Sequence, residues 1–123
     1  MINRRKFLGQ AGMAGAAMMI APKLLSAKSV NKVGIQLYSL RDYLPKDVKG
    51  VTAKVAQAGY KEVETYGYGI QNGYWGLDAK AYSELLKANG LVSPSGHYGL
   101  DQYLKDGGLT DLQNNINAAH TIG

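Results

Sequence analysis

The sequence predicts an α/β fold built from parallel strand–helix units. Alternating runs rich in branched residues begin near residues 33, 60 and 91. This spacing of about 30 residues fits a strand, a crossover helix and the next parallel strand. Three such units do not close a strand–helix barrel, which needs eight strands and typically has about 250 residues. An open sheet of three units could exist alone, but no strand follows the last predicted helix. We therefore expect the 123 residues to be the N-terminal part of a longer protein, an incomplete barrel.

The first unit is predicted to contain a strand over Val33–Tyr38 and a helix over Lys46–Ala58. In the predicted strand, branched apolar residues alternate with other residue types, and in the predicted helix apolar residues recur at helical spacing. Gly59 follows the helix, as glycine commonly does at a helix end. The predicted inward stripe of this helix consists of Val48, Val51, Val55 and Ala58.

The second unit begins with a short predicted strand over Tyr60–Glu64, followed by a glycine- and aromatic-rich loop over Tyr66–Gly76. A helix is predicted over Asp78–Asn89, with Asp78 as its N-cap and Gly90 after its end. The core stripe of this helix is predicted to be Tyr82, Leu85 and Leu86.

The third unit begins with a predicted strand over Leu91–Ser95, which Pro94 should make short or irregular. A short helical segment is predicted around Asp101–Lys105. Thr110 is predicted to cap a last helix that ends near Gly123. Its inward residues are predicted to be Leu112, Ile116 and Ala119.

Residues 1–27 are typical of an export signal. Arg4 and Arg5 precede a weakly apolar run from Phe7 to Ala21, and small residues end the segment before a predicted cleavage after Ala27. Paired arginines favour the twin-arginine translocase as the partner during export, with an ordinary secretory signal as the alternative. The run is too short to span a bilayer, which needs about 20 apolar residues. We expect a periplasmic or otherwise exported protein without a stable membrane anchor.

Composition excludes several classes of function. The chain has no cysteine, which rules out disulfides, thiolate zinc sites and iron–sulfur clusters. Its net charge is +5, but four of its 14 basic residues lie in residues 1–27, which hold no acid. The remainder carries ten bases against nine acids. A body this close to neutral gives no reason to expect nucleic acid as a partner.

Polar side chains gather where the three predicted strands end, and ligands of parallel α/β folds bind beyond those ends. They are Gln36, Tyr38, Ser39 and Arg41 on the first strand, Glu62, Glu64 and Tyr66 on the second, and Ser95, Gly96, His97 and Tyr98 on the third. Because side chains alternate along a strand, Gln36 lies on one face of the first strand, and Ile35 and Leu37 lie on the other face. The apolar set should pack against the helices, so Gln36 should point into the barrel, where an amide needs a partner or a ligand.

The acidic and histidine residues at these ends are the candidates for chemistry. Glu62 and Glu64 share one strand face, although Glu62 could simply be solvated at the strand start. His97 follows a glycine at the predicted mouth and could act as acid or base, hydrogen-bond donor or metal ligand. The alternative is a structural histidine bonded to the neighbouring strand. His120, late in a helix, is predicted to be solvated or to complement the helix dipole.

The loop from Tyr66 to Trp75 carries four aromatic residues and two amide side chains. Aromatic faces beside amide groups suit a sugar ring, so we expect a small carbohydrate as the ligand. The alternative is a loop that packs on its own tyrosines. Gly67 and Gly69 do not form a dinucleotide-binding motif, because they follow the second strand and no third glycine opens the helix.

Three segments together carry a resemblance to a known family: Val33–Asp42, Gly59–Glu64 and Ser95–His97. With the leader, they resemble the sugar phosphate isomerase/epimerase family, whose members are xylose isomerase-like TIM barrels. The resemblance covers about residues 33–123.

The resemblance implies a metal-assisted proton transfer next to a sugar carbonyl, with Mn²⁺, Mg²⁺ or Zn²⁺ held by acidic and histidine residues of later strands. It implies catalytic roles for Glu64 and His97, and no metal ligand can be assigned in this chain. Gln36 and Tyr38 would be their first-strand neighbours. Arg41, Tyr66 and Trp75 complete the predicted substrate-binding set. A DNA-repair endonuclease shares this barrel but needs several histidines, and only one lies at a strand end here.

The leading hypothesis is thus an exported sugar isomerase or epimerase in carbohydrate metabolism, present here as an N-terminal fragment that by itself is expected to be inactive and marginally stable. A sugar lyase or dehydratase on the same fold is one alternative. The others are a non-catalytic carbohydrate-binding domain and a fragment that completes its sheet by self-association, so an oligomer is possible.

Overall fold

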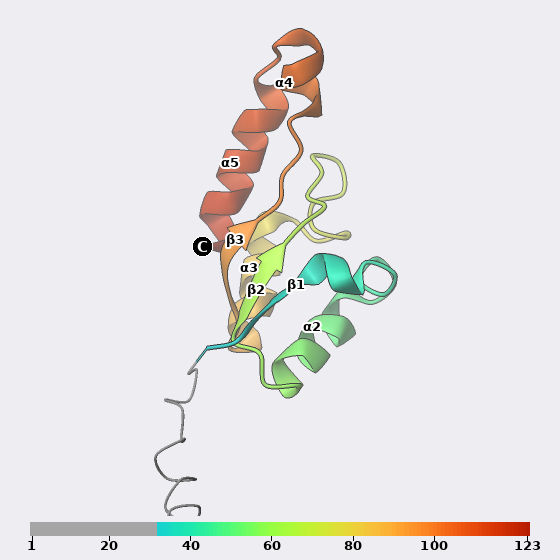
Figure 1. Ribbon diagram of the computed structural model, residues 1–123, viewed down its shortest axis with the longest axis vertical. Coiled ribbons are helices and arrows are strands. Elements are labelled where there is room, and N and C mark those ends of the chain that lie inside the picture. The colour runs from blue at the N-terminus through green and yellow to red at the C-terminus, as the bar shows by residue number, and fades with distance from the viewer. Residues whose placement is uncertain (1–31) are drawn as a thin grey trace, which may run out of the picture. The chain divides into compact units, whose positions relative to one another are not determined.

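A computed structural model describes residues 32–123, so the predicted signal peptide over residues 1–27 lies outside the described residues. The described unit is a mixed α/β fold with one three-stranded sheet, in which all strands are parallel and the order is β1-β2-β3 (Figure 1). The strands are β1 (Gly34–Gln36), β2 (Glu62–Thr65) and β3 (Val92–Gly96). The predicted parallel strand–helix units are therefore confirmed.

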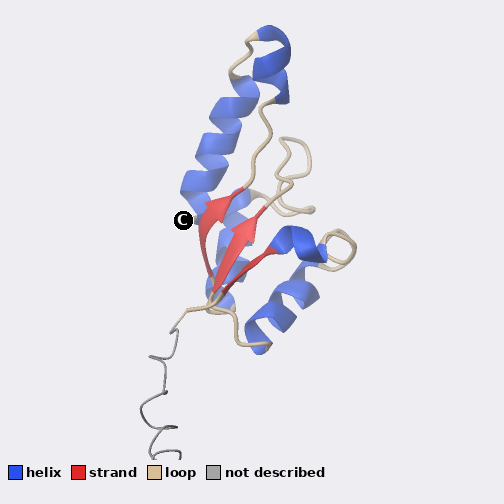
Figure 2. Ribbon diagram, viewed as in Figure 1, coloured by secondary structure: helices blue, strands red, loops and turns tan. Residues whose placement is uncertain are grey.

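Helices connect and follow the strands (Figure 2). A short 3₁₀ helix, η1, leads from β1 towards α2, α3 lies between β2 and β3, and α4 and α5 follow β3. Among these described helices, none is long and apolar enough to cross a membrane. Their bounds are η1 (Leu37–Leu40), α2 (Val48–Gln57), α3 (Ala79–Ala88), α4 (Asp101–Asp106) and α5 (Thr110–Ile122).

Local signals place α2 and α3 close to their predicted positions. Asp78 caps α3 as predicted, because its Oδ1 accepts the backbone N–H of Ala81 at 2.7 Å. Asp47 caps α2 in the same way, accepting the N–H of Gly50 at 2.8 Å. Gly90, after α3, has the left-handed φ of 66° expected at such an end.

The core lies on one face of the sheet, which we call the helix-covered face. Val63 and Thr65 of β2 and Ser93 of β3 are buried there. The opposite face, which we call the uncovered face, carries side chains that are exposed or half-buried, and no described element covers it. The buried apolar cluster is Leu37, Leu44, Val55, Val63, Tyr74, Tyr82, Leu86, Leu91, Ala118 and Ile122.

The first strand is shorter than predicted. Pairing with β2 stops at Gln36, and residues 37–40 turn into η1 instead of continuing to Tyr38. The turn buries Leu37. It is closed by a hydrogen bond from the Arg41 N–H to the Tyr38 carbonyl. Burial of a leucine thus wins over the β propensity of this segment.

The predicted inward face of the last helix is wrong at Ile116, whereas Leu112 and Ala119 are half-buried, and its predicted cap at Thr110 is wrong. The buried residues of α5 are Asn115, Ala118 and Ile122, whereas Ile116 is 53% exposed. Asn115 is drawn inward because its amide donates to the carbonyl of Gly99 at 2.9 Å. Thr110 is the first helical residue, and Leu109 occupies the N-cap position without a side-chain hydrogen bond.

The third strand is irregular where Pro94 predicted it. Glu62 of β2 pairs with Val92, but Glu64 pairs with Ser95, so β3 contributes one residue more than β2 between these pairs. Such a bulge leaves one residue outside the ladder. Its effect is to bring Ser95, and not Pro94, to the position opposite Glu64.

Candidate functional site

The strand register brings one polar residue from each strand into a row on the uncovered face. Gln36 of β1 pairs with Glu64 of β2, and Glu64 pairs with Ser95 of β3. This row lies at the carboxyl ends of the strands, where parallel α/β folds place their ligands. Gln36 and Glu64 were predicted to lie here, and the structure brings them together.

The carboxylate of Glu64 is the centre of this row. Its Oε1 accepts the amide N–H of Gln36 at 2.7 Å, and its Oε2 accepts the hydroxyl of Ser95 at 2.9 Å. The Nε2 atom of His97 lies 2.9 Å from the same Oε1. We call these four residues the Glu64 network.

The network favours the ionised form of Glu64. Hydrogen bonds from Ser95 and then Gln36 lower the pKa of Glu64 below its ordinary value, and the charge of His97 adds to them while burial opposes. The side chains of His97 and Glu64 are 66% and 30% exposed, so both remain open to a ligand. A fixed carboxylate against an accessible imidazole is an arrangement that can orient the ring and move a proton.

The remaining candidates form a second group, which we call the aromatic group: Tyr38, Arg41, Tyr66 and Trp75. The rings of Tyr38 and Tyr66 meet edge to face at 5.2 Å, and Tyr66 lies 5.1 Å from the ring of Trp75. The guanidinium carbon of Arg41 lies 4.9 Å from the centre of the Tyr38 ring, within cation–π range. The seven predicted site residues thus form two groups: Gln36, Glu64 and His97, and Tyr38, Arg41, Tyr66 and Trp75.

Two weaker candidates lie apart from the network. Glu62 is paired in register with Gly34 and Val92, at the start of β2, and within residues 32–123 its carboxylate makes no ion pair. This matches the alternative of a solvated Glu62. His120 is exposed in the last turn of α5. His97 does bond to the neighbouring strand, which the structural alternative required, so its catalytic role stays a prediction.

The loop that carries Trp75 is packed partly on its own tyrosines. Within the loop, the ring of Tyr74 lies 5.0 Å from that of Tyr68. Outside the loop, the Tyr74 ring stacks on Tyr82 of α3 at 4.9 Å, and its hydroxyl is 2.7 Å from the hydroxyl of Tyr98. Burial raises the pKa of Tyr74 above its ordinary value, and its hydrogen bond with Tyr98 adds to this effect. Gly73 allows the tight turn, because a Cβ there would collide with the carbonyl of Leu77.

Trp75 has a strained backbone. Its φ of 51° lies in the left-handed region, and the other described residues with positive φ are all glycines. A side chain in this region costs roughly 1–2 kcal/mol. Such strain is concentrated at ligand sites and switches, which supports a binding role for the half-buried indole.

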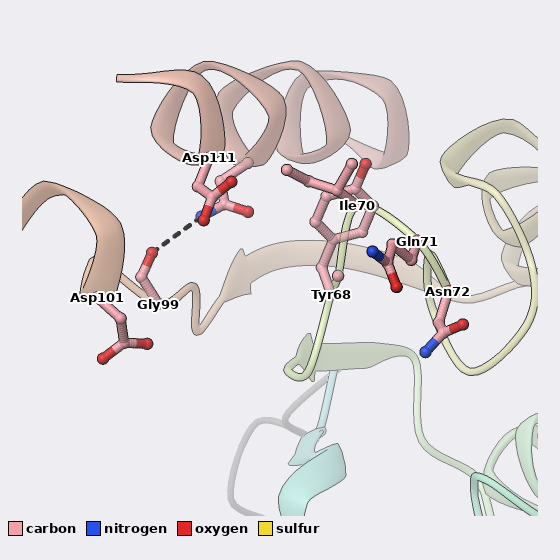
Figure 3. A pocket seen from close by; sticks show the side chains of 9 residues that line it. Tyr68, Ile70, Gln71, Asn72, Gly99, Asp101 and Asp111 are labelled. Atoms are coloured by element: carbon pink, nitrogen blue, oxygen red, sulfur yellow. Dashed lines mark hydrogen bonds between the residues drawn. The ribbon is translucent and has the colours of Figure 1, made fainter. Parts of the chain in front are cut away.

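A cavity of about 450 Å³ lies between the loop after β2 and the segment that joins β3 to α5 (Figure 3). We call it the loop cavity. It was not predicted, because its walls come from segments about 30 to 45 residues apart and only the tertiary fold joins them. Its polar wall includes Tyr68, Gln71, Asn72, Asp101, Asp111 and Asn115.

Ser95 was also missing from the predicted site residues. It was noticed at a strand end, but its partnership with Glu64 depends on the bulge at Pro94. A proline next to a serine at the end of a predicted strand is the signal that could have suggested it.

The described residues do not supply a metal site. Across residues 32–123, no three histidine, aspartate or glutamate side chains converge in a way that could hold a metal ion. The uncovered face brings only Glu64 and His97 together, and these two bond to each other. A divalent cation needs more ligands than this pair offers.

Comparison with family models and with curated proteins finds no match to this chain.

Proposed function

We propose that this protein is an exported sugar isomerase or epimerase that transfers a proton at the carbon next to a sugar carbonyl. The observation that carries this proposal is the Glu64 network at the carboxyl ends of three parallel strands. A carboxylate that contacts an accessible imidazole supplies the acid–base pair that such a reaction requires.

In this proposal His97 transfers the proton and Glu64 orients and stabilises His97. The imidazole of His97 takes the proton from the carbon next to the carbonyl. In an isomerisation it returns this proton to the neighbouring carbon on the same face, while a proton passes from the hydroxyl oxygen to the carbonyl oxygen. In an epimerisation a water molecule protonates the opposite face, and His97 releases its proton to solvent. The ionised Glu64 orients the ring and stabilises the imidazolium that forms, as a buried or fixed carboxylate does beside a catalytic histidine. Gln36 and Ser95 hold the carboxylate in place through both of its oxygens.

The aromatic group provides a wall for the sugar. Tyr66 follows Glu64 by two positions, and its ring lies 5.1 Å from that of Trp75. In this proposal the sugar ring stacks on these aromatic rings through its C–H groups. Arg41 is held against the Tyr38 ring and offers hydrogen-bond donors to hydroxyl or carbonyl oxygens of the substrate.

The fold supports a barrel as the finer architecture of the whole protein. The uncovered face is polar at its carboxyl end, and a parallel sheet is normally covered on both faces. In a closed TIM barrel, the uncovered face would become the inner wall, with the helices outside. Any metal would then require ligands from strands beyond the three described.

The test is hydrogen–deuterium exchange into a sugar substrate in D₂O, followed by NMR on the protein expressed from its complete reading frame. Glu64→Gln and His97→Gln should each lower exchange by about 10²–10⁴-fold. Glu84→Gln, on the exposed side of α3, and His120→Gln are matched controls that should retain it. Exchange that survives in both site variants would refute the proposal.

A non-catalytic carbohydrate-binding domain is the second candidate. Both oxygens of Glu64 already have partners, which is also what a purely structural network would show. Trp75→Ala should weaken sugar binding under either function. A protein that binds sugars through Trp75 but exchanges no deuterium would favour the second candidate.

A further inference from the structure

We propose that the loop cavity binds an uncharged, polyhydroxylated part of the substrate, so that the sugar handled by this protein carries no phosphate. This inference rests on the proposed function and names its substrate class. The residues that line the loop cavity belong neither to the predicted site residues nor to the Glu64 network.

Two segments of the cavity wall continue along the chain from the candidate site. Tyr68 and Gly99, in its wall, each follow a site residue by two positions, namely Tyr66 and His97. The Tyr68 ring also lies 6.4 Å from that of Tyr98, next to His97 in the chain. The same two strand-end segments therefore form both the site and the cavity. Its volume of about 450 Å³ falls within the range of about 300–1,000 Å³ typical of ligand pockets.

The wall offers donors and acceptors that lack protein partners. Gln71 and Asn72 lie on one side, and Asp101 and Asp111 lie on the other (Figure 3). Within residues 32–123, the side chains of these four residues form no hydrogen bond with another protein group. The bond to Gln102 involves only the backbone N–H of Asp111, at 3.0 Å. Amides both donate and accept, and carboxylates accept, which together match the hydroxyl groups of a sugar.

Asn115 is a buried polar group in the same wall. The residue is only 9% exposed, and its amide nitrogen donates to the carbonyl of Gly99 at 2.9 Å. Within the described part of the chain, its amide oxygen has no hydrogen-bond partner, and the residue lines the cavity. Because this oxygen is not one of the fully buried, unpartnered atoms of the described residues, it is accessible and can accept a hydrogen bond from water or from a ligand hydroxyl.

The charge of the cavity argues against a phosphate. Asp101 and Asp111 contribute two carboxylates, and no lysine or arginine lines the wall. Neither carboxylate forms a salt bridge within residues 32–123. A phosphate would be repelled by both charges without a compensating cation, whereas hydroxyl groups would donate to them.

The experiment compares neutral and phosphorylated sugars by saturation-transfer NMR on the protein expressed from its complete reading frame. The neutral probes are D-glucose, D-fructose, D-xylose and cellobiose, and the charged probes are glucose 6-phosphate, fructose 6-phosphate and xylulose 5-phosphate. At least one neutral sugar should bind, about tenfold or more tightly than any phosphate. The isosteric double variant Asp101→Asn/Asp111→Asn should reduce this preference to about threefold or less, while Glu84→Gln should leave it unchanged.

The outcomes separate this inference from the proposed function. The cavity inference would be overturned if the phosphorylated sugars bound equally or more tightly. It would also be overturned if the double variant kept the preference for neutral sugars. Neither result would change the deuterium-exchange test of Glu64 and His97. Glu64→Gln should keep the preference for neutral sugars and lose deuterium exchange. Neutral binding through the cavity without exchange in the wild type would overturn the proposed function alone, and no binding by any probe would overturn both.

Discussion

The two faces of the sheet use polar residues in opposite ways. On the helix-covered face, Thr65 is completely buried and its hydroxyl has no hydrogen-bond partner. On the uncovered face, Gln36, Glu64 and Ser95 are more exposed, yet they are bonded to one another across three strands. Stability comes from one face and the candidate chemistry from the other, so substitutions should separate the two.

The separation depends on strand alternation. Val63, Glu64 and Thr65 follow one another in β2, and only the middle residue reaches the uncovered face. A shift of one residue would exchange the two faces completely. The bulge at Pro94 preserves the arrangement on β3, because it returns a polar side chain to the position opposite Glu64.

The largest expected effect is on the helix-covered face. Leu86 of α3 is 1% exposed within the core cluster. Leu86→Ala should destabilise the protein by about 2–5 kcal/mol, because it removes buried methyl groups and leaves a cavity. Urea unfolding followed by circular dichroism measures this change. The matched control is Leu104→Ala on α4, which is 76% exposed and should change stability by less than about 0.5 kcal/mol.

Much of this division could be predicted from the sequence, because its causes are local. Alternation in the strands and helical spacing in α2 and α3 are properties of neighbouring residues, as are the cap at Asp78 and the glycine after α3. The inward face of α5 could not be predicted in this way. The buried Asn115 donates to the carbonyl of Gly99, 16 residues earlier. Hydrophobic periodicity places apolar residues inward, so it gives no reason to expect a buried asparagine.

The candidate site was predictable to a similar extent. Glu64, His97 and Gln36 follow from the rule that ligands bind at the carboxyl ends of parallel strands. The role of Ser95 requires the exact pairing of β2 with β3, and the loop cavity requires two loops to fold against each other. Both depend on tertiary contacts, which no short window of sequence contains.

A smaller effect would sharpen the contrast on the helix-covered face. Thr65→Val replaces the unpartnered hydroxyl by a methyl group of similar size, so we expect stabilisation of about 1 kcal/mol. Thr52→Val is the matched control, since the buried Thr52 hydroxyl donates to the carbonyl of Val48 at 2.7 Å. Its loss should cost about 1 kcal/mol. Thermal unfolding should show a higher melting temperature for Thr65→Val and a lower one for Thr52→Val. Destabilisation by Thr65→Val would show that the Thr65 hydroxyl has a hydrogen-bond partner in solution.

The smallest effect is expected on the uncovered face, and it appears only in acid. Because the hydrogen bonds from Ser95 and Gln36 lower the pKa of Glu64 in the folded protein, its ionised form stabilises the fold above its ordinary pKa of 4.5. That contribution is lost as the pH falls below this value and through the lowered pKa. Stability measured by urea unfolding at a series of pH values should therefore decline less steeply below pH 4.5 in Glu64→Gln than in the wild type. Glu84→Gln should keep the wild-type slope. An equal slope in all three proteins would contradict the prediction and show that the ionisation of Glu64 does not stabilise the fold.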